Sequence, residues 1–139
     1  KNVIMDNETE IWKDKTFLVA EDETSNYLFI KEILFESGAN VIWAKTGKEV
    51  LDIVKEKKTS IDLILMDIKI PEINGIEATK IIKEADNNIP IVAQTAYAME
   101  EDRDKCLTAG CDDYIAKPIN IEEFLTIIKN VLEKYASRK

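Results

Sequence analysis

An almost unbroken apolar run that ends in an acid places the strongest constraint on how this chain folds. Residues 61–66 read IDLILM, and Asp67 follows directly. A run of this length, apolar on both faces, is typical of a strand buried on both sides of a parallel sheet. Pro71, Asn74 and Gly75 then mark a loop. Because ligands of parallel α/β sheets bind where strands end, Asp67 is a candidate reactive residue, although a lone Asp after a strand is more often a helix cap.

The composition limits the class of protein. The chain has 139 residues, 27 acidic and 19 basic, and a formal net charge of −8. This length suits one domain, and the negative charge disfavours sequence-independent binding of nucleic acid. No apolar run approaches the ~18 residues that a membrane span needs. Without histidine, the two cysteines, Cys106 and Cys111, are too few for a zinc site, and any phosphohistidine must come from another chain or domain.

Short apolar runs alternate with helical patterns along the chain. Helix signals include Thr24 or Ser25 as a first cap, Gly38 after that helix, and Thr46 as the next cap. We expect strands at 16–20, 40–44, 61–67, 89–94 and 112–116, and helices at 24–37, after 46, and at 75–85, 98–108 and 121–135.

This alternation predicts an α/β protein of the (βα)5 flavodoxin-like type, with a doubly wound parallel five-stranded sheet in the order 2-1-3-4-5. Residues 1–15 read as a linker or N-terminal tail, with Ile11 and Trp12 touching the domain. The domain covers 16–135, and 136–139 form a C-terminal tail.

Polar side chains follow four of the predicted strands: Glu21 and Asp22, then Asp67, Thr95 and Lys117. In this strand order the first and third strands are neighbours, so we expect the three carboxylates to lie together. Two like charges at close range repel by about 4 kcal/mol at intermediate dielectric, which calls for a cation among them. Mg²⁺ suits carboxylate, carbonyl and water ligands. With Lys117 and Thr95 beside it, this set indicates a phosphoryl group bound at Asp67.

Each of these residues has a plainer explanation when taken alone. Glu21 and Asp22 could cap a helix, Thr95 could be an ordinary strand-end hydroxyl, and Lys117 could be a solvated lysine before a turn. Their coincidence at the strand ends of one sheet favours a functional site.

Four segments between Phe17 and Ile119 resemble the receiver domain of the two-component response-regulator family: FLVAEDE, LILMDIKIPEINGIEAT, PIVAQTA and DDYIAKPI. The resemblance implies that Asp67 is the phospho-acceptor. It implies that Asp22 binds Mg²⁺ directly, that Glu21 binds it through water, and that the Lys69 carbonyl is a further ligand.

The same resemblance assigns roles on the last two strands. Thr95 and Lys117 would contact the phosphoryl oxygens, and Tyr114 would be the aromatic residue that reorients on activation. The peptide bond before Pro118 is expected to be cis.

The implied function is a phosphorelay receiver that takes a phosphoryl group from a histidine kinase or histidine phosphotransfer domain and signals by conformational change. It would catalyse its own phosphorylation and slow dephosphorylation, with Lys69 and Tyr97 shielding the phosphoryl group from water. Asn26 and the start at Lys1 suit a receiver of a hybrid histidine kinase, and a stand-alone regulator is the alternative. We expect a cytoplasmic domain, which faces the cytoplasm if the parent protein is a membrane-anchored kinase, and no nucleic-acid binding.

Other classes fit the sequence less well. A flavodoxin-type carrier needs a Gly-rich phosphate loop where this chain has Glu21, Asp22 and Glu23. Thr46-Gly47-Lys48 resembles the end of a P-loop without its upstream glycine. A haloacid-dehalogenase-type phosphatase needs a second Asp where Lys69 stands. A pseudo-receiver that never takes phosphate is disfavoured by the complete acid set.

The first predicted helix carries two stripes. Tyr27, Ile30 and Leu34 form the expected core stripe. Asn26, Phe29, Ile33 and Glu36 form the other, on which we expect Asn26, Phe29 and Ile33 to be an exposed docking surface for a helical, histidine-bearing partner. Gln94 stands where an aliphatic residue is usual in the family, so it either disturbs strand packing or bonds to a neighbouring loop.

Overall fold

The computed structural model describes residues 11–57, 60–96 and 100–138, with only the backbone of 100 and 101. Five parallel strands form one sheet in the order β2-β1-β3-β4-β5, which confirms the predicted topology. The strands are β1 (Thr16–Ala20), β2 (Asn40–Ala44), β3 (Leu63–Asp67), β4 (Ile91–Thr95) and β5 (Asp113–Ala116). The helices are α1 (Thr24–Glu36), α2 (Gly47–Lys57), α3 (Gly75–Ala85), α4 (Glu100–Ala109) and α5 (Ile121–Ala136).

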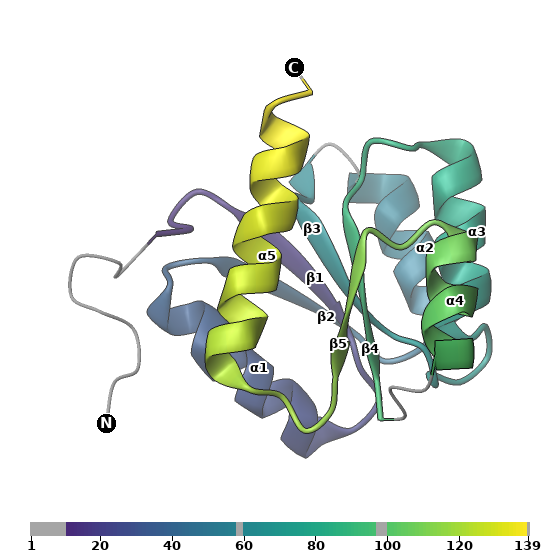
Figure 1. Ribbon diagram of the computed structural model, residues 1–139, viewed down its shortest axis with the longest axis horizontal. Coiled ribbons are helices and arrows are strands. Elements are labelled where there is room, and N and C mark those ends of the chain that lie inside the picture. Colours follow the sequence, from purple (N-terminus) through teal and green to yellow (C-terminus); the bar gives the residue numbers. More distant parts are fainter. Residues whose placement is uncertain (1–10, 58–59, 97–99, 139) are drawn as a thin grey trace.

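The helices cover the sheet in two layers, α1 and α5 on one face and α2, α3 and α4 on the other (Figure 1). Strand β3 is buried along its whole length, as its apolar run predicts. Its residues alternate between the two cores: Ile64 and Met66 pack on the α2–α4 side, and Leu63 and Leu65 on the α1–α5 side. Among the helices described, none is long and apolar enough to cross a bilayer.

Two of the residues predicted to mark helix ends are confirmed, and one predicted cap is wrong. Thr46 caps α2, because its hydroxyl accepts the N–H of Glu49 at 3.0 Å, and Gly38 follows α1 with a φ of 84°. The predicted cap of α1, Thr24 or Ser25, is wrong, since the N-cap is Glu23. The carboxylate of Glu21 accepts the Glu23 N–H at 3.1 Å, and the chain therefore enters the helix before the hydroxyl residues.

The segment before β1 belongs to the α1–α5 core. Trp12 is buried, and its ring lies 5.3 Å from that of Phe17. Its backbone N–H donates to the Ser37 carbonyl at 2.9 Å. The chain is therefore packed from Trp12 onward, whereas the rest of the predicted tail, residues 1–10, lies outside the described residues.

A buried polar network closes the sheet at its other edge, away from the strand ends that carry the predicted site. Lys83 of α3 donates to Asp112 at 3.1 Å and to the Tyr135 hydroxyl at 2.7 Å, and that hydroxyl donates to Asp112 at 2.8 Å. Asp112 also accepts the Ile91 N–H. The network thus joins α3, α5 and the starts of β4 and β5, and burial together with the Asp112 charge raises the pKa of Tyr135.

We predict that Tyr135→Phe lowers the free energy of unfolding by about 2 kcal/mol at neutral pH, because it breaks hydrogen bonds to two charged groups. A raised phenol pKa means that this contribution is complete below the ordinary value near 10 and is lost as the pH rises through the folded value. Urea unfolding at pH 7 and above pH 10 measures both effects. Tyr114→Phe is the matched control, and equal stability of Tyr135→Phe and the parent at pH 7 would contradict the assignment.

Candidate functional site

The sheet order brings three carboxylates together, as the sequence predicts. Glu21 and Asp22 follow β1, Asp67 ends the adjacent β3, and their oxygens lie within 4.8 Å of one another. Glu21 and Asp67 are buried, whereas Asp22 is exposed. This edge of the sheet lies at the bottom of Figure 1, opposite the C-terminus. A set of hard oxygen donors, one of them open to solvent, could hold a divalent cation.

Lys117 reaches this cluster from the end of β5. Its Nζ donates to Asp67 at 2.8 Å and to Glu21 at 3.2 Å. The peptide bond between Lys117 and Pro118 is cis, which confirms the prediction, and the Lys117 N–H donates to the Thr95 carbonyl at 2.8 Å. The ammonium group therefore supplies the positive charge that two buried carboxylates require.

The electrostatics of Glu21 and Lys117 reflect this crowding. Burial raises the pKa of Glu21, and the nearby Asp67 charge adds to the rise, while hydrogen bonds from Asn26 and the Glu23 N–H and the charge of Lys117 partly offset it. Burial alone would lower the pKa of Lys117, but its bonds and charge attraction to Asp67 and Glu21 raise it. Lys117 is thus held as a cation.

Thr95, Lys69 and Tyr114, the other residues that the sequence assigned to the site, differ in their surroundings. Thr95 is buried at the end of β4, next to Ala116 of β5. The backbone N–H of Lys69 donates to Asp67 at 3.0 Å, and its side chain is exposed. Tyr114 packs on the α2–α4 side, with the Arg103 guanidinium 5.3 Å from its ring centre. The predicted shielding residue Tyr97 lies outside the described residues.

The predicted docking stripe on α1 needs correction. Ile33 is buried, and Asn26 donates to the Glu21 carboxylate at 2.5 Å, so neither belongs to an exposed stripe, whereas Phe29 is exposed as expected. The buried face of α1 is wider than the core stripe Tyr27, Ile30 and Leu34, because the helix also packs with Trp12 from the segment before β1. The exposed apolar residues of α1 are Leu28, Phe29 and Phe35.

The loop after Asp67 depends on two glycines whose role the sequence analysis missed. The Pro71 carbonyl accepts the N–H of Gly47 at 3.1 Å and of Ile73 at 2.9 Å. A Cβ on Gly47 would stand 1.7 Å from the Ile73 oxygen, and one on Gly75 would stand 2.3 Å from the Asp67 oxygen. Only glycine permits these approaches. A glycine that opens a helix, as both do, is the signal that could have found them.

Gln94 is buried beside the site, and neither polar atom of its amide has a hydrogen-bond partner in the described structure. It lies next to Asp67 on β3 and Ile115 on β5. Of the two interpretations that the sequence left open, a bond to a neighbouring loop is not formed with any described residue. Its amide is a polar group enclosed on a strand whose other residues are also buried.

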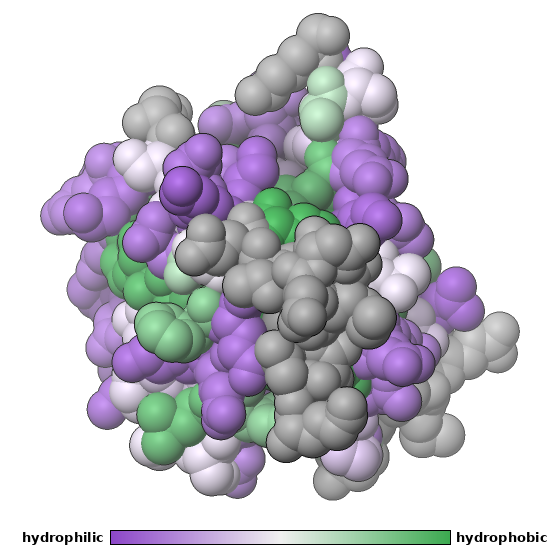
Figure 2. Space-filling view, turned by 90° about the vertical axis from the view of Figure 1, so that its left-hand side faces the viewer, coloured by the Kyte–Doolittle hydropathy of each residue, from purple (hydrophilic) through white to green (hydrophobic). Residues whose placement is uncertain are grey.

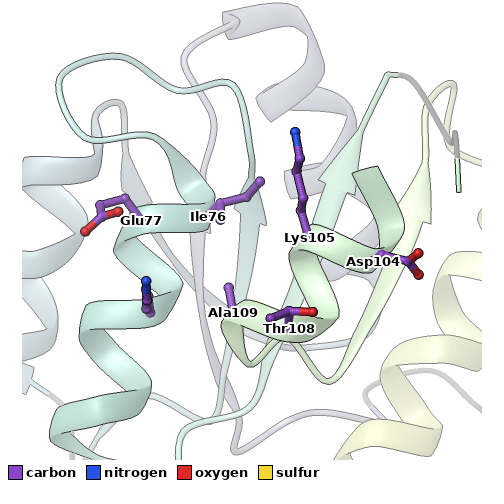
Figure 3. Close-up of a pocket in the computed structure, with 7 residues that line it drawn as sticks. Ile76, Glu77, Asp104, Lys105, Thr108 and Ala109 are labelled. Carbon is purple, nitrogen blue, oxygen red and sulfur yellow. The ribbon is translucent and has the colours of Figure 1, made fainter. Parts of the chain in front are cut away.

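An open groove of about 400 Å³ lies between α3 and α4, away from the acids (Figure 3). Ile76 and Ala109 point into it, whereas Glu77 and Asp104 point outward. In a typical ligand site, a few polar groups converge on one point, whereas the polar side chains of this groove do not. The carboxylate cluster is therefore the candidate site of this chain.

Comparison with known proteins agrees with this geometry. The chain matches the response regulator receiver domain over residues 17–129 and belongs to that family. It is 44% identical over 125 residues to hybrid signal transduction histidine kinase I of Dictyostelium discoideum. This match covers 85% of this chain and 7% of that protein. It is 38% identical over 120 residues to the polar-differentiation response regulator DivK of Brucella anthropi, covering 85% and 96%.

Solved structures show the same fold. A CheY-like receiver domain from Methanospirillum hungatei superposes with a TM-score of 0.82 at 30% identity, covering 90% of this chain and 98% of that one. A complex of the Saccharomyces cerevisiae histidine phosphotransfer protein Ypd1 with the receiver domain of the response regulator Ssk1 matches with a TM-score of 0.74 at 31% identity, covering 81% and 84%. The chain is a receiver domain of two-component signalling.

We predict that Gln94→Met raises the free energy of unfolding by about 1–2 kcal/mol, because it replaces an unpaired buried amide by an apolar side chain of similar volume. Chemical denaturation measures the change. Gln94→Glu should have the opposite effect, since it buries a charge beside Asp67. A Met variant less stable than the parent would mean that the amide is paired in solution.

Proposed function

We propose that this receiver takes a phosphoryl group from a phosphohistidine onto Asp67, with Mg²⁺, and passes the signal on by a change of conformation. The observation that carries the proposal is the contact of the buried Asp67 carboxylate with Lys117 at 2.8 Å, within a cluster of three acids. An isolated acid would have neither a charge partner nor a metal-binding neighbour.

The chemistry follows from the positions of these groups. An Asp67 oxygen attacks phosphorus, the P–N bond to the partner's imidazole breaks, and the imidazole leaves with that electron pair. The Lys117 ammonium group, 2.8 Å from Asp67, can stabilise the negative charge that develops on the phosphoryl oxygens. The Thr95 hydroxyl is the second proposed contact to those oxygens. Buried donors that are already in position cost little reorganisation during transfer.

The metal would bind to oxygen atoms that this chain already gathers. Asp22 is the exposed acid and the proposed direct ligand, with Asp67, the Lys69 carbonyl and, through water, Glu21 completing the set. When bound, Mg²⁺ would neutralise charge on the phosphoryl oxygens and the carboxylates. Slow loss of the phosphoryl group stays a prediction.

The proposed partner is a helical protein or domain that carries the phosphohistidine, since this chain has no histidine. Leu28, Phe29 and Phe35 of α1 are exposed to 52%, 40% and 75%. Figure 2 views the molecule from the left-hand side of Figure 1, the side on which α1 ends. On this face, separate apolar areas lie among polar ones. Apolar side chains spaced among charged ones suit a contact that forms and separates with each transfer. The similar Ypd1–Ssk1 complex supports this partner class.

The whole protein could be a hybrid kinase or a stand-alone regulator. The similar Dictyostelium kinase is far longer than this chain, which covers 7% of it, whereas DivK is matched over 96% of its length. We favour the hybrid kinase because that relative has the higher identity over the same share of this chain.

Asp67→Asn should abolish labelling by acetyl phosphate, because the amide is a poor nucleophile, and removal of Mg²⁺ by chelation should do the same to the parent. Asp22→Ala should raise the Mg²⁺ concentration needed for half-maximal labelling. Asp52→Asn on the exposed face of α2 is the control with an equal change of charge. Full labelling of Asp67→Asn would rule out Asp67 as the phospho-acceptor. A parent protein that takes no label from acetyl phosphate would be a pseudo-receiver.

Docking can be separated from chemistry by the choice of phosphodonor. Leu28→Ala combined with Phe29→Ala should slow transfer from a cognate phosphohistidine protein by about tenfold, or 1.4 kcal/mol, and leave acetyl phosphate labelling unchanged. Leu107→Ala on α4, which removes a side chain with 40% exposure, is the control. An unchanged rate of transfer to the double variant would exclude α1 as the docking surface.

A further inference from the structure

The loop that carries Glu21 and Asp22 is tied to the edge strand β2 through its backbone. The indole N–H of Trp43 donates to the Glu21 carbonyl at 2.7 Å. On the other side of the same residue, the Glu21 N–H donates to the Ala44 carbonyl at 2.9 Å. Both peptide groups that flank Glu21 are therefore held by consecutive residues of one strand.

The Trp43 ring is itself held in one orientation. It stacks on Tyr27 of α1 with ring centres 3.9 Å apart and planes 4° from parallel, and the Lys45 ammonium lies 4.7 Å from its centre. Rotating the indole away from Glu21 would break the stack and the cation–π contact. The indole N–H is thus a fixed donor.

The position of Asp22 follows from this hydrogen bond. The Glu21 carbonyl belongs to the peptide group that precedes Asp22, so fixing it also fixes the direction in which the Asp22 backbone leaves the strand. The Glu21 carboxylate is held by Asn26, Glu23 and Lys117. Within the described residues, no hydrogen bond to the Asp22 carboxylate is found, and its placement depends on its backbone.

We infer that Trp43 is a positioning residue for the metal site, acting through the Glu21–Asp22 peptide rather than by contact with the ion. The inference rests on the proposed function, because it concerns the metal that accompanies phosphotransfer. A carboxylate already aimed at the metal loses less conformational freedom on binding than one on a mobile loop. Partners that orient ligands in this way commonly change metal affinity by 10–100-fold when they are removed.

Trp43→Phe tests the donor, because phenylalanine keeps an aromatic ring beside Tyr27 but has no N–H. Calorimetric titration with Mg²⁺ alone should show a Kd about tenfold higher than that of the parent. Trp12→Phe is the matched control: the same exchange in the same core, without contact to Glu21, and its Kd should equal the parent's. At saturating Mg²⁺, labelling of Trp43→Phe should return to the parental level, as a positioning role requires.

A second measurement leaves Trp43 in place. The chain has two tryptophans, so Trp12→Phe makes Trp43 the sole indole emitter. Its emission should change on titration with Mg²⁺, with a midpoint at the calorimetric Kd. Equal Kd values for Trp43→Phe and the parent would overturn the positioning role alone. A parent that binds no Mg²⁺ would overturn the proposed function as well.

Discussion

The ion contacts of Lys117 with two buried carboxylates are the interaction on which the rest of the site depends. Glu21 and Asp67 lie on adjacent strands, where their charges would repel by about 4 kcal/mol at intermediate dielectric without a cation. Lys117 contacts both, at 3.2 and 2.8 Å. Because it comes from the far side of the sheet, after β5, the charge balance couples the first, third and fifth strands. The positive partner of the two buried acids is therefore supplied only where the fifth strand is in place beside the others.

Contacts to the backbone also hold these acids in position. Gly47 and Gly75 let the loop after Asp67 lie against the starts of α2 and α3, closer than any side chain would permit. Trp43 and Ala44 hold the peptide groups around Glu21. Backbone anchoring of this kind limits how far each acid can move, as the proposed metal and phosphoryl binding would require.

Polar groups on the two edges of the sheet have different surroundings. At the C-terminal edge, Asp22 is exposed and Lys117 is partly so, as a site that exchanges ligands requires. At the opposite edge, Lys83 and Asp112 are 8% exposed and pair with each other and with Tyr135. The second network joins α3 and α5 to the starts of β4 and β5. An open edge is consistent with the phosphotransfer proposed for this member of the receiver family.

Much of the fold, and the grouping of three carboxylates at one edge of the sheet, could be predicted from the sequence. Strand and helix periods are local properties, and the 2-1-3-4-5 order then brings Asp67, Glu21 and Asp22 to one edge. The tertiary structure alone decided which helix faces are covered. Ile33 and Trp12 are buried because segments distant in sequence pack on one another. The Asn26 side chain turns inward, where it donates to the buried Glu21 carboxylate. It also decided the enclosed amide of Gln94 and the contact of Trp43 with Glu21. Residue type and spacing predict which groups are apolar or charged, whereas the partner of each polar group depends on which distant segment arrives beside it.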